Sequence, residues 1–595
     1  MQEFTSPGAV EVSTDENTTT VLWNWERTNP DKPVLAHRPD GGEFVDLSFG
    51  EVASMSRRVA AGLMSLGLVK GDKVCIYSPS RYEYTILNYG VWAAGCAVVT
   101  IYETSSADQV EWIVKDSGAK AIICADGTLE KTFQEKAGQL GTCDHVFSID
   151  EGGFDALITA GAGISDAEVI KRAESVGQDD IATLIYTSGT TGRPKGCVLT
   201  VRNFQWELGQ IESAASDLLH ENSVTLMFLP LAHVFANLVQ AAQLQAGGKI
   251  AFSTGIPNLV EELGIVQPTW VFSVPRVFEK IYNSVEQKAI DDGKGAIFGK
   301  AVDAAIAFSE QRQAGKVGLG TKLKHTIFNK LVYGKLRAVF GGRIDFALSG
   351  GAALGSRLGH FFDGIGVTVL EGYGLTETTA GATLNLPGAI RIGTVGRPLP
   401  GVTIRITDDG EILIKGEHIF RGYWNNDAAT AETIRAGWFH SGDIGELDSN
   451  GYLSITGRKK ELIVTASGKN VAPAVLEDKI RANALISQCI VVGDAKPFIG
   501  ALVTIDAEAF PRWAEEHGKE GSVADLVADD ELRASVQVAI DKANATVSKP
   551  ESIREFRILP QDFTIEGGEI TPTLKVKRNV VADRYASSIR DIYGD

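Results

Sequence analysis

The sequence has 595 residues, with 75 acidic and 57 basic side chains and a net charge of −18. Hydrophobic residues make up 44% and charged residues 22%, which is near the average for globular proteins and excludes a disordered or fibrous protein. The length indicates more than one domain, and the acidic balance argues against nucleic-acid binding over the whole surface, because no basic field is present to neutralise phosphates.

The longest apolar run, residues 91–101, is shorter than the roughly 18 residues that a membrane-spanning helix needs. The N-terminus has neither the basic start nor the apolar core of a secretory signal. The six cysteines are scattered without a CxxC pair, which favours a reducing compartment. We therefore expect a cytoplasmic protein.

The first 180 residues alternate short apolar runs with segments of helical periodicity. Residues 73–78, 96–102 and 119–125 are typical of buried strands, and residues 107–118 have apolar side chains at helical spacing. This alternation predicts a parallel sheet covered by helices. Further strands of the same kind are predicted at residues 181–187, 223–230, 270–275, 343–350 and 367–374.

The pattern changes at about Gly393. Residues 402–416 form two alternating segments around an Asp-Asp-Gly turn, which predicts a hairpin, and the short strands that follow predict a small antiparallel barrel or twisted sheet. Past this sheet, helices and strands mix again. We predict an α/β fold with a large multi-part N-terminal domain at 1–457 and a smaller, mobile α+β domain at 458–595.

The segment YTSGTTGRPKG (186–196) continues from the predicted strand at 181–187. Its hydroxyls, glycines and two cations suit a loop that wraps phosphate oxygens, although an ordinary solvated turn is the alternative. It is not a GxxxxGK[ST] loop, because a proline precedes Lys195. The candidate phosphate-binding residues are Thr187, Ser188, Gly189, Thr190, Thr191, Gly192 and Lys195.

This loop closely resembles the phosphate-binding loop of the adenylate-forming (AMP-binding) enzymes. Other segments are similar to that family's motifs, in the same order and along nearly the whole chain. They include LPLAHVF (229–235), SGGAALG (349–355), EGYGLTET (371–378), GWFHSGDIG (437–445), GRKKELIVTASGKNVAP (457–473) and PTLKVKR (572–578). Within the family, LPLAH, the segment VPRVFEKIY (274–282) and the length look most like long-chain fatty-acid–CoA ligases.

The resemblance implies that ATP and a long-chain fatty acid form an acyl-adenylate and pyrophosphate, and that coenzyme A then displaces AMP. It also implies Mg²⁺, which counters the charge that gathers at the phosphorus. The alternative is a fatty acyl-AMP ligase that passes the acyl group to a carrier protein. No extra block is evident between Glu377 and Asp443, which favours coenzyme A. A non-catalytic adenylate-binding protein would be expected to lack Lys575 or Glu377, and both are present.

The resemblance also assigns catalytic roles. Glu377 matches the Mg²⁺ carboxylate and Lys575 matches the C-terminal catalytic lysine; from the residues alone, Glu377 could cap a helix and Lys575 could belong to a basic tail with Lys577. His233 matches a histidine at the entrance of the acyl pocket, although a lone histidine among apolar neighbours is more often a core residue. The catalytic candidates are Lys575, Thr187, Glu377 and His233.

The nucleotide site is assigned in the same way. Tyr373 matches the ring that stacks on adenine, and Asp443 and Arg458 match the groups that reach the ribose hydroxyls. Taken alone, Tyr373 could be a core aromatic and Asp443 a turn residue. The nucleotide-binding candidates outside the phosphate loop are Gly350, Gly351, Ala352, Glu371, Gly372, Tyr373, Gly374, Thr376, Asp443 and Arg458.

Lys460 matches the hinge position at which the smaller domain swivels, and Ser467 and Gly468 match the loop that lines the coenzyme A tunnel. The resemblance thus implies domain alternation, with Lys575 facing inward for adenylation and Gly468 facing inward for thioester formation.

One segment, 321–343, is not explained by these motifs. It has six basic residues and no acidic one, and Leu323, Ile327 and Leu331 recur every four positions, which predicts an amphipathic basic helix. We expect the apolar stripe to pack on the core with the basic face in water. Peripheral contact with an anionic membrane surface is the alternative.

Overall fold

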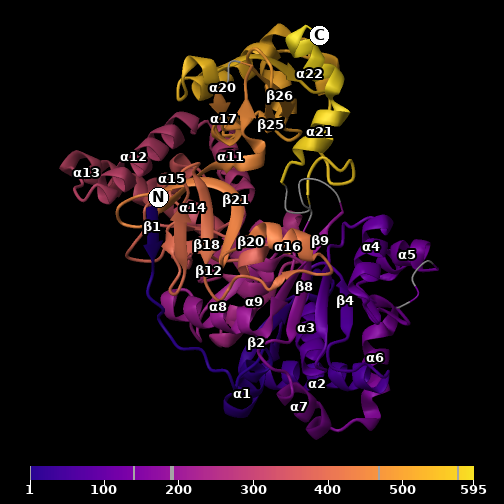
Figure 1. Cartoon of the computed structure of the whole chain (residues 1–595). Helices are drawn as coiled ribbons and strands as arrows, with labels where there is room; N and C mark the ends of the chain where they lie inside the picture. Colours follow the sequence, from indigo (N-terminus) through magenta and orange to yellow (C-terminus); the bar gives the residue numbers. More distant parts are fainter. Residues whose placement is uncertain are drawn as a thin grey trace.

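The computed structural model describes residues 2–138, 141, 143–187, 193–466, 469–571 and 575–594. A large α/β part makes up most of the molecule, and a smaller α+β part that contains the C-terminus lies above it in Figure 1. Within the described ranges, no helix is both long enough and apolar enough to cross a bilayer.

A seven-stranded sheet lies at the centre of the N-terminal half, in the order β19-β9-β8-β5-β4-β6-β7. Successive residues of a strand point to opposite faces, and both faces of β4 are buried: Val74 packs with helices α2 and α3, whereas Cys75 packs with α4 and α5. The predicted helix-covered parallel sheet is confirmed for β8, β5, β4, β6 and β7, whereas β9 and β19 extend it with antiparallel pairings. The bounds are β4 Lys73–Tyr77, β5 Ala97–Ile101, β6 Ala121–Cys124, β7 His145–Ser148, β8 Ile181–Thr187, β9 Lys195–Thr200, β19 Gly422–Tyr423, α2 Phe49–Ser65, α3 Tyr82–Ala93, α4 Ala107–Ser117 and α5 Gly127–Ala137.

Two further sheets carry the other predicted strands. One has the order β10-β11-β2-β3 and the other β12-β13-β14-β15-β16, in which β12, β13 and β14 are parallel. Because these three strands run together, their carboxyl ends share one edge of the sheet. The bounds are β2 Pro33–His37, β3 Val45–Ser48, β10 Val224–Met227, β11 Lys249–Phe252, β12 Trp270–Ser273, β13 Phe346–Ser349, β14 Thr368–Tyr373, β15 Thr383–Leu384 and β16 Arg397–Pro398.

The predicted hairpin is present, with β17 (Thr403–Ile406) antiparallel to β18 (Glu411–Lys415). It belongs to a six-stranded sheet whose described pairings run from β1 to β20 without closing into a barrel. Strand β1 (Gln2–Thr5) pairs with β17, which no local pattern predicted. The other bounds are β20 Ile434–Arg435, β21 Trp438–Leu447 and β22 Leu453–Arg458.

The C-terminal part has hydrophobic clusters of its own, formed by residues between Ile463 and Ile592. Ion pairs join it to helix α11 (Pro275–Asp291) of the large part: Arg276 Nη2 lies 3.2 Å from Asp506 Oδ2, and Arg512 Nη1 lies 2.9 Å from Asp291 Oδ1. The boundary between 457 and 458 stays a prediction. The bounds are α17 Pro473–Arg481, β25 Ile486–Val492, β26 Ile499–Ile505, α18 Phe510–Glu516, α20 Asp530–Asn544, β27 Ile553–Ile558, α21 Arg578–Arg584 and α22 Ala586–Tyr593.

The basic segment is helical, but the prediction that its apolar stripe packs inward is wrong. Leu323, Ile327 and Leu331 are 65%, 47% and 61% exposed. The inward side is formed instead by His325, which stacks on Phe308 of α12. A periodic pattern shows that a stripe exists but not which side of the helix meets the core. The bounds are α12 Gly295–Gln313, α13 Leu319–Phe328, a wider helical turn Asn329–Tyr333 and α14 Gly334–Val339.

Candidate functional site

The candidate residues gather where strands of two sheets end. Thr187 ends β8, and Tyr373 ends β14 beside the loop that follows β13. The carboxyl ends of strands are where ligands bind in open α/β sheets, since the loops there diverge and expose backbone groups. Thr187 pairs with Lys195 across β8 and β9. The predicted residues Ser188, Gly189, Thr190, Thr191 and Gly192 lie outside the described part of the chain.

A hydrogen bond holds Glu377. The hydroxyl of Tyr423, on β19, donates to Glu377 Oε1 over 2.7 Å. Burial and the nearby Glu377 raise the pKa of Tyr423, so the phenol keeps its proton and remains a donor. The same ring faces Lys195, whose Nζ lies 5.1 Å from the ring centroid. Tyr423 therefore joins the end of the phosphate loop to the candidate metal carboxylate.

The backbone around Glu377 is tightly constrained. Thr379 and Ala380 have φ of 50° and 84°, a region that side chains other than glycine rarely adopt. A Cβ on Gly374 would lie 1.7 Å from the carbonyl oxygen of Ala380, so only glycine fits there. Thr376, in the same turn as Glu377, is buried. Such strain persists where the surrounding structure over-determines the loop.

Tyr373 and Asp443 form the second pair. Tyr373 Oη donates to Asp443 Oδ2 over 2.7 Å, and Arg458 Nε donates to Oδ1 over 2.9 Å. Asp443 and Arg458 are cross-strand partners on β21 and β22, and Asp443 is only 4% exposed. Each carboxylate oxygen has a second lone pair, so Asp443 can also accept bonds from ligand hydroxyls.

The glycine-rich loop after β13 lies beside an aromatic side chain of the large part. A Cβ on Gly350 would lie 3.4 Å from the ring of Phe235. Gly351 has φ of +85°, which favours glycine. The adjacent Ala352 is exposed. Gly350 therefore lies against the Phe235 ring, whereas Gly351 and Ala352 are exposed.

Glu371 lies beneath this loop, within β14. Its Oε2 accepts a 2.9 Å hydrogen bond from the backbone N–H of Leu354. Burial raises the pKa of Glu371 to about 7, because the charged form is poorly solvated there. The next residue, Gly372, pairs with Leu384 of β15. Glu371 therefore supports the loop from below.

Lys575 reaches this site from the C-terminal part. Its Cε lies 3.9 Å from the position that a Cβ on Gly351 would occupy. Although the residue is accessible to solvent, the surrounding protein and the Arg458 guanidinium lower its pKa. The carboxylates of Asp443 and Glu377 oppose this shift. Lys575 is thus the group of the small part that lies at the glycine-rich loop, and the two candidate carboxylates favour its charged form.

His233 caps helix α9 (Val234–Gln245), since its Nδ1 accepts a 3.2 Å hydrogen bond from the backbone N–H of Phe235. Burial, and secondarily the charge on Lys575, lower the pKa of His233 to about 3. At neutral pH the imidazole is therefore uncharged, with its proton on Nε2. His233 therefore caps helix α9 and also lies close enough to Lys575 for that charge to lower its pKa.

The predicted hinge lies between two anchored residues. Lys459 Nζ lies 2.7 Å from Asp409 and 2.9 Å from Glu411, both in the large part. Glu461 accepts a 3.1 Å bond from Arg578 of the small part. Lys460 stands between them. The predicted coenzyme A residues Ser467 and Gly468 lie outside the described part of the chain.

Sequence reasoning missed Tyr423 and Lys459. Tyr423 follows the predicted hairpin in the segment RGYWNN, and nothing local marks it. Its position depends on the pairing of β19 with β9, which places residue 423 opposite Cys197. Lys459 lies in the motif at 457–473, but its ion-pair partners Asp409 and Glu411 lie in the hairpin at 402–416. The motif alone therefore does not indicate this contact.

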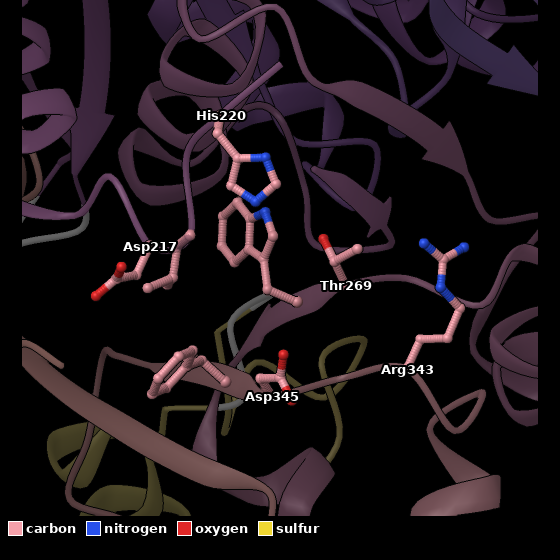
Figure 2. Close-up of a pocket in the computed structure, with 8 residues that line it drawn as sticks. Asp217, His220, Thr269, Arg343 and Asp345 are labelled. Atoms are coloured by element: carbon pink, nitrogen blue, oxygen red, sulfur yellow. The ribbon is translucent and has the colours of Figure 1, made fainter. Parts of the chain in front are cut away.

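A pocket of about 350 Å³ lies elsewhere, lined by residues that include Asp217, His220, Thr269, Arg343 and Asp345 (Figure 2). Thr269 precedes β12 and Asp345 precedes β13, so this pocket lies at the amino ends of these strands. The glycine-rich loop follows the other end of β13. The pocket is therefore separate from the candidate site.

Two families of known sequences match the chain. The AMP-binding enzyme family matches residues 22–424, and the AMP-binding enzyme C-terminal domain matches residues 460–595. A curated relative from Mycobacterium bovis, "Long-chain-fatty-acid--CoA ligase FadD15", is 48% identical over 100% of both chains. The human "Long-chain-fatty-acid--CoA ligase 1" is 28% identical over 94% of this chain and 84% of its own length.

Solved structures share the fold. The anthranilate CoA ligase AuaEII with anthranoyl-AMP has a TM-score of 0.71 at 19% identity, over 97% of this chain and 99% of that one. The adenylation domain of a carboxylate reductase from Mycobacterium chelonae has a TM-score of 0.76 at 21% identity, over 98% and 92%. With both family matches in order along the sequence, the chain belongs to the AMP-binding enzyme family.

Proposed function

We propose that the protein is a ligase that activates a long-chain fatty acid with ATP and transfers the acyl group to coenzyme A. The substrate class is supported by the full-length relative from Mycobacterium bovis, whose name gives that activity. The chemistry is supported by one observation above all: Lys575 from the small part lies beside Gly351 of the large part. That contact brings a cation from one part to the glycine-rich loop of the other.

In the proposed first step, a carboxylate oxygen of the fatty acid attacks the α-phosphorus of ATP and pyrophosphate leaves. Lys575 neutralises charge on the carboxylate and the α-phosphate, and the carboxylates of Asp443 and Glu377 favour its charged form. Tyr373 stacks on adenine, while Asp443 accepts bonds from the ribose. The small residues Gly350, Gly351 and Ala352 would leave space for the base beside the loop.

The residues present also suit Mg²⁺. Glu377 supplies one hard oxygen donor, and the bond from Tyr423 to Oε1 leaves Oε2 to bind a cation together with the phosphates of ATP. When bound, Mg²⁺ would offset negative charge on the phosphates. The residues of the phosphate loop, from Thr187 to Lys195, would hold the same phosphates with hydroxyl and backbone N–H groups.

In the proposed second step, the sulfur of coenzyme A attacks the acyl carbonyl and AMP leaves. The small domain would first rotate at Lys460, because Lys459 is anchored to the large part and Glu461 to the small one. Rotation withdraws Lys575 and brings the loop of Ser467 and Gly468 toward the site. His233, uncharged and near Lys575, would lie at the entrance of the acyl pocket.

The test is an assay with purified protein, ATP, Mg²⁺ and fatty acids from octanoate to palmitate, with and without coenzyme A. We expect AMP release and thioester formation that depend on coenzyme A and are fastest with long chains. Acyl-AMP that accumulates and ignores coenzyme A would contradict the proposal and identify a carrier-protein ligase. Activity confined to short chains would support the acyl-CoA ligase reaction but contradict a long-chain fatty acid as the substrate.

A further inference from the structure

The outer face of helix α13 and of the helical turn that follows it (Asn329–Tyr333) carries an apolar stripe, called the α13 stripe, that no described part of the chain covers. It consists of Leu319, Leu323, Ile327 and Leu331, spaced four residues apart. Three of these residues, Leu319, Leu323 and Leu331, are 86%, 65% and 61% exposed and are the three most exposed large hydrophobic side chains in the described ranges. Apolar groups gathered in one row at such exposure mark an interaction site rather than scattered surface residues.

The helix itself is firmly seated, so the stripe does not result from a detached segment. On the inner side, the His325 ring stacks on Phe308 at 3.8 Å between centroids, and its Nε2 lies 2.7 Å from the carbonyl oxygen of Gly364. Tyr333, just beyond the helix, is buried, and its hydroxyl donates to the carbonyl of Ala301 over 2.8 Å. The stripe is thus held outward by contacts on the opposite face.

Basic side chains border the stripe on both sides. Lys322 and Lys324 flank Leu323 in the sequence, and neighbours on a helix point about 100° apart, so one lysine lies on each side. Lys330 is adjacent to Leu331. All three are exposed. Residues 319–343 contain no aspartate or glutamate.

We propose that the α13 stripe docks on an anionic lipid bilayer, with helix α13 lying in the plane of the interface. The leucines would enter the boundary between headgroups and acyl chains, while the lysine stems extend along it and their ammonium groups contact lipid phosphates. Helices α12 and α13 project at the edge of the molecule in Figure 1, so a flat surface can reach them.

The overall charge of −18 does not oppose this docking. Interactions between exposed charges are screened beyond about 8 Å at physiological salt, so the lysines that border the stripe dominate at the contact. The proposal does not depend on the substrate, because it rests only on the exposed stripe and on its charge complementarity with the lipid.

The experiment is flotation of the full-length protein with vesicles of phosphatidylcholine alone or mixed with phosphatidylglycerol, without ATP or fatty acid. We expect binding to the anionic vesicles that weakens as salt is raised. A triple variant, Lys322→Glu, Lys324→Glu and Lys330→Glu, should bind about a hundredfold more weakly. The matched control, Lys131→Glu, Lys171→Glu and Lys542→Glu, makes the same change of net charge at exposed lysines elsewhere and should bind as the unmodified protein does.

The apolar contribution is tested separately. Leu319→Ser, Leu323→Ser and Leu331→Ser together should weaken binding at least about tenfold. Val45→Ser, Val69→Ser and Val538→Ser, at side chains that are 49%, 56% and 51% exposed, are the control and should leave binding unchanged. All of these residues are at the surface, so unaltered thermal melting is expected for each variant.

Two results would overturn the proposal. One is that the unmodified protein does not float with anionic vesicles, or that the lysine and leucine triple variants float as well as the unmodified protein. The other is that the protein is a dimer without vesicles and the leucine variant is a monomer, which would assign the stripe to contact with a second copy. Neither result depends on turnover, so failure of the proposed ligase activity would be seen independently.

Discussion

The hydroxyl of Tyr423 donates a 2.7 Å hydrogen bond to Oε1 of Glu377, from a strand 46 residues further along the chain. A carboxylate fixed through one oxygen presents the other in a constant direction, and a donor of this kind is typical of the groups that orient metal ligands. This contact makes Tyr423 a positioning residue for Glu377.

Tyr423→Phe should raise the Mg²⁺ concentration needed for half-maximal adenylation by about tenfold, because the carboxylate loses its orienting donor. The ring and its packing on Phe420 are retained, so the melting temperature should change little. Tyr452→Phe is the control, since that hydroxyl bonds the carbonyl of Ala389 and not a site carboxylate. A Mg²⁺ titration with the same midpoint in Tyr423→Phe and in the unmodified protein would show that Tyr423 does not position Glu377.

Lys575→Ala should slow acyl-AMP formation by about 10²- to 10³-fold, the usual loss when one preorganised donor of charge is removed. Thioester formation from supplied acyl-AMP should change much less, because Lys575 is proposed to leave the site before that step. The two half-reactions are measured separately by pyrophosphate release and by thioester yield. Lys577→Ala is the matched control, two residues further along the same segment. Equal losses in both half-reactions would contradict domain alternation.

Asp443→Ala should raise the KM for ATP by about tenfold or more while leaving the KM for fatty acid nearly unchanged. The carboxylate organises both the Tyr373 hydroxyl and the Arg458 guanidinium, and hydrogen bonds to a charged group contribute about 1.5–3 kcal/mol each. Initial rates over a range of ATP and then of fatty acid distinguish the two constants. If the fatty-acid constant rose and the ATP constant did not, Asp443 would lie outside the ribose site.

The pKa of Glu371 predicts a pH-dependent stability. Its pKa is about 7 in the folded protein against 4.5 as the ordinary value, so between these pH values the folded state binds more protons than the unfolded state. The contribution of this group to the free energy of unfolding is therefore greatest below about pH 4.5 and decreases as the pH rises toward 7. Above pH 7 the loss is complete and amounts to about 3 kcal/mol.

Glu371→Gln retains an acceptor for the backbone N–H of Leu354 and removes the charge. Relative to the unmodified protein, the variant should gain stability as pH is raised from 5 to 8, on the order of 2–3 kcal/mol. Urea unfolding of both proteins at the two pH values measures this difference. A gap between the two proteins that is the same at both pH values would mean that burial does not shift this carboxyl group.

The sequence by itself determined many of the strands and helices and the family motifs, because these depend on local patterns. Short continuous apolar runs identified β4, β5 and β6, alternating apolar residues identified the hairpin of β17 and β18, and helical spacing identified α4. These patterns depend on side-chain period within a few residues, so they can be read without knowledge of the rest of the chain. The motifs likewise named Lys575, Glu377 and Asp443 as candidates before any contact between them was known.

Only the tertiary structure decided which residues meet. Strand β1 pairs with β17, Tyr373 bonds Asp443, and Lys575 lies beside Gly351, each across a long separation in the sequence. For helix α13 the sequence pattern was correct and the expected orientation was wrong, since periodicity defines a stripe but not the side that faces the core. Which surface is buried depends on what packs against it, and for α13 the stacking of His325 on Phe308 turns the leucines outward.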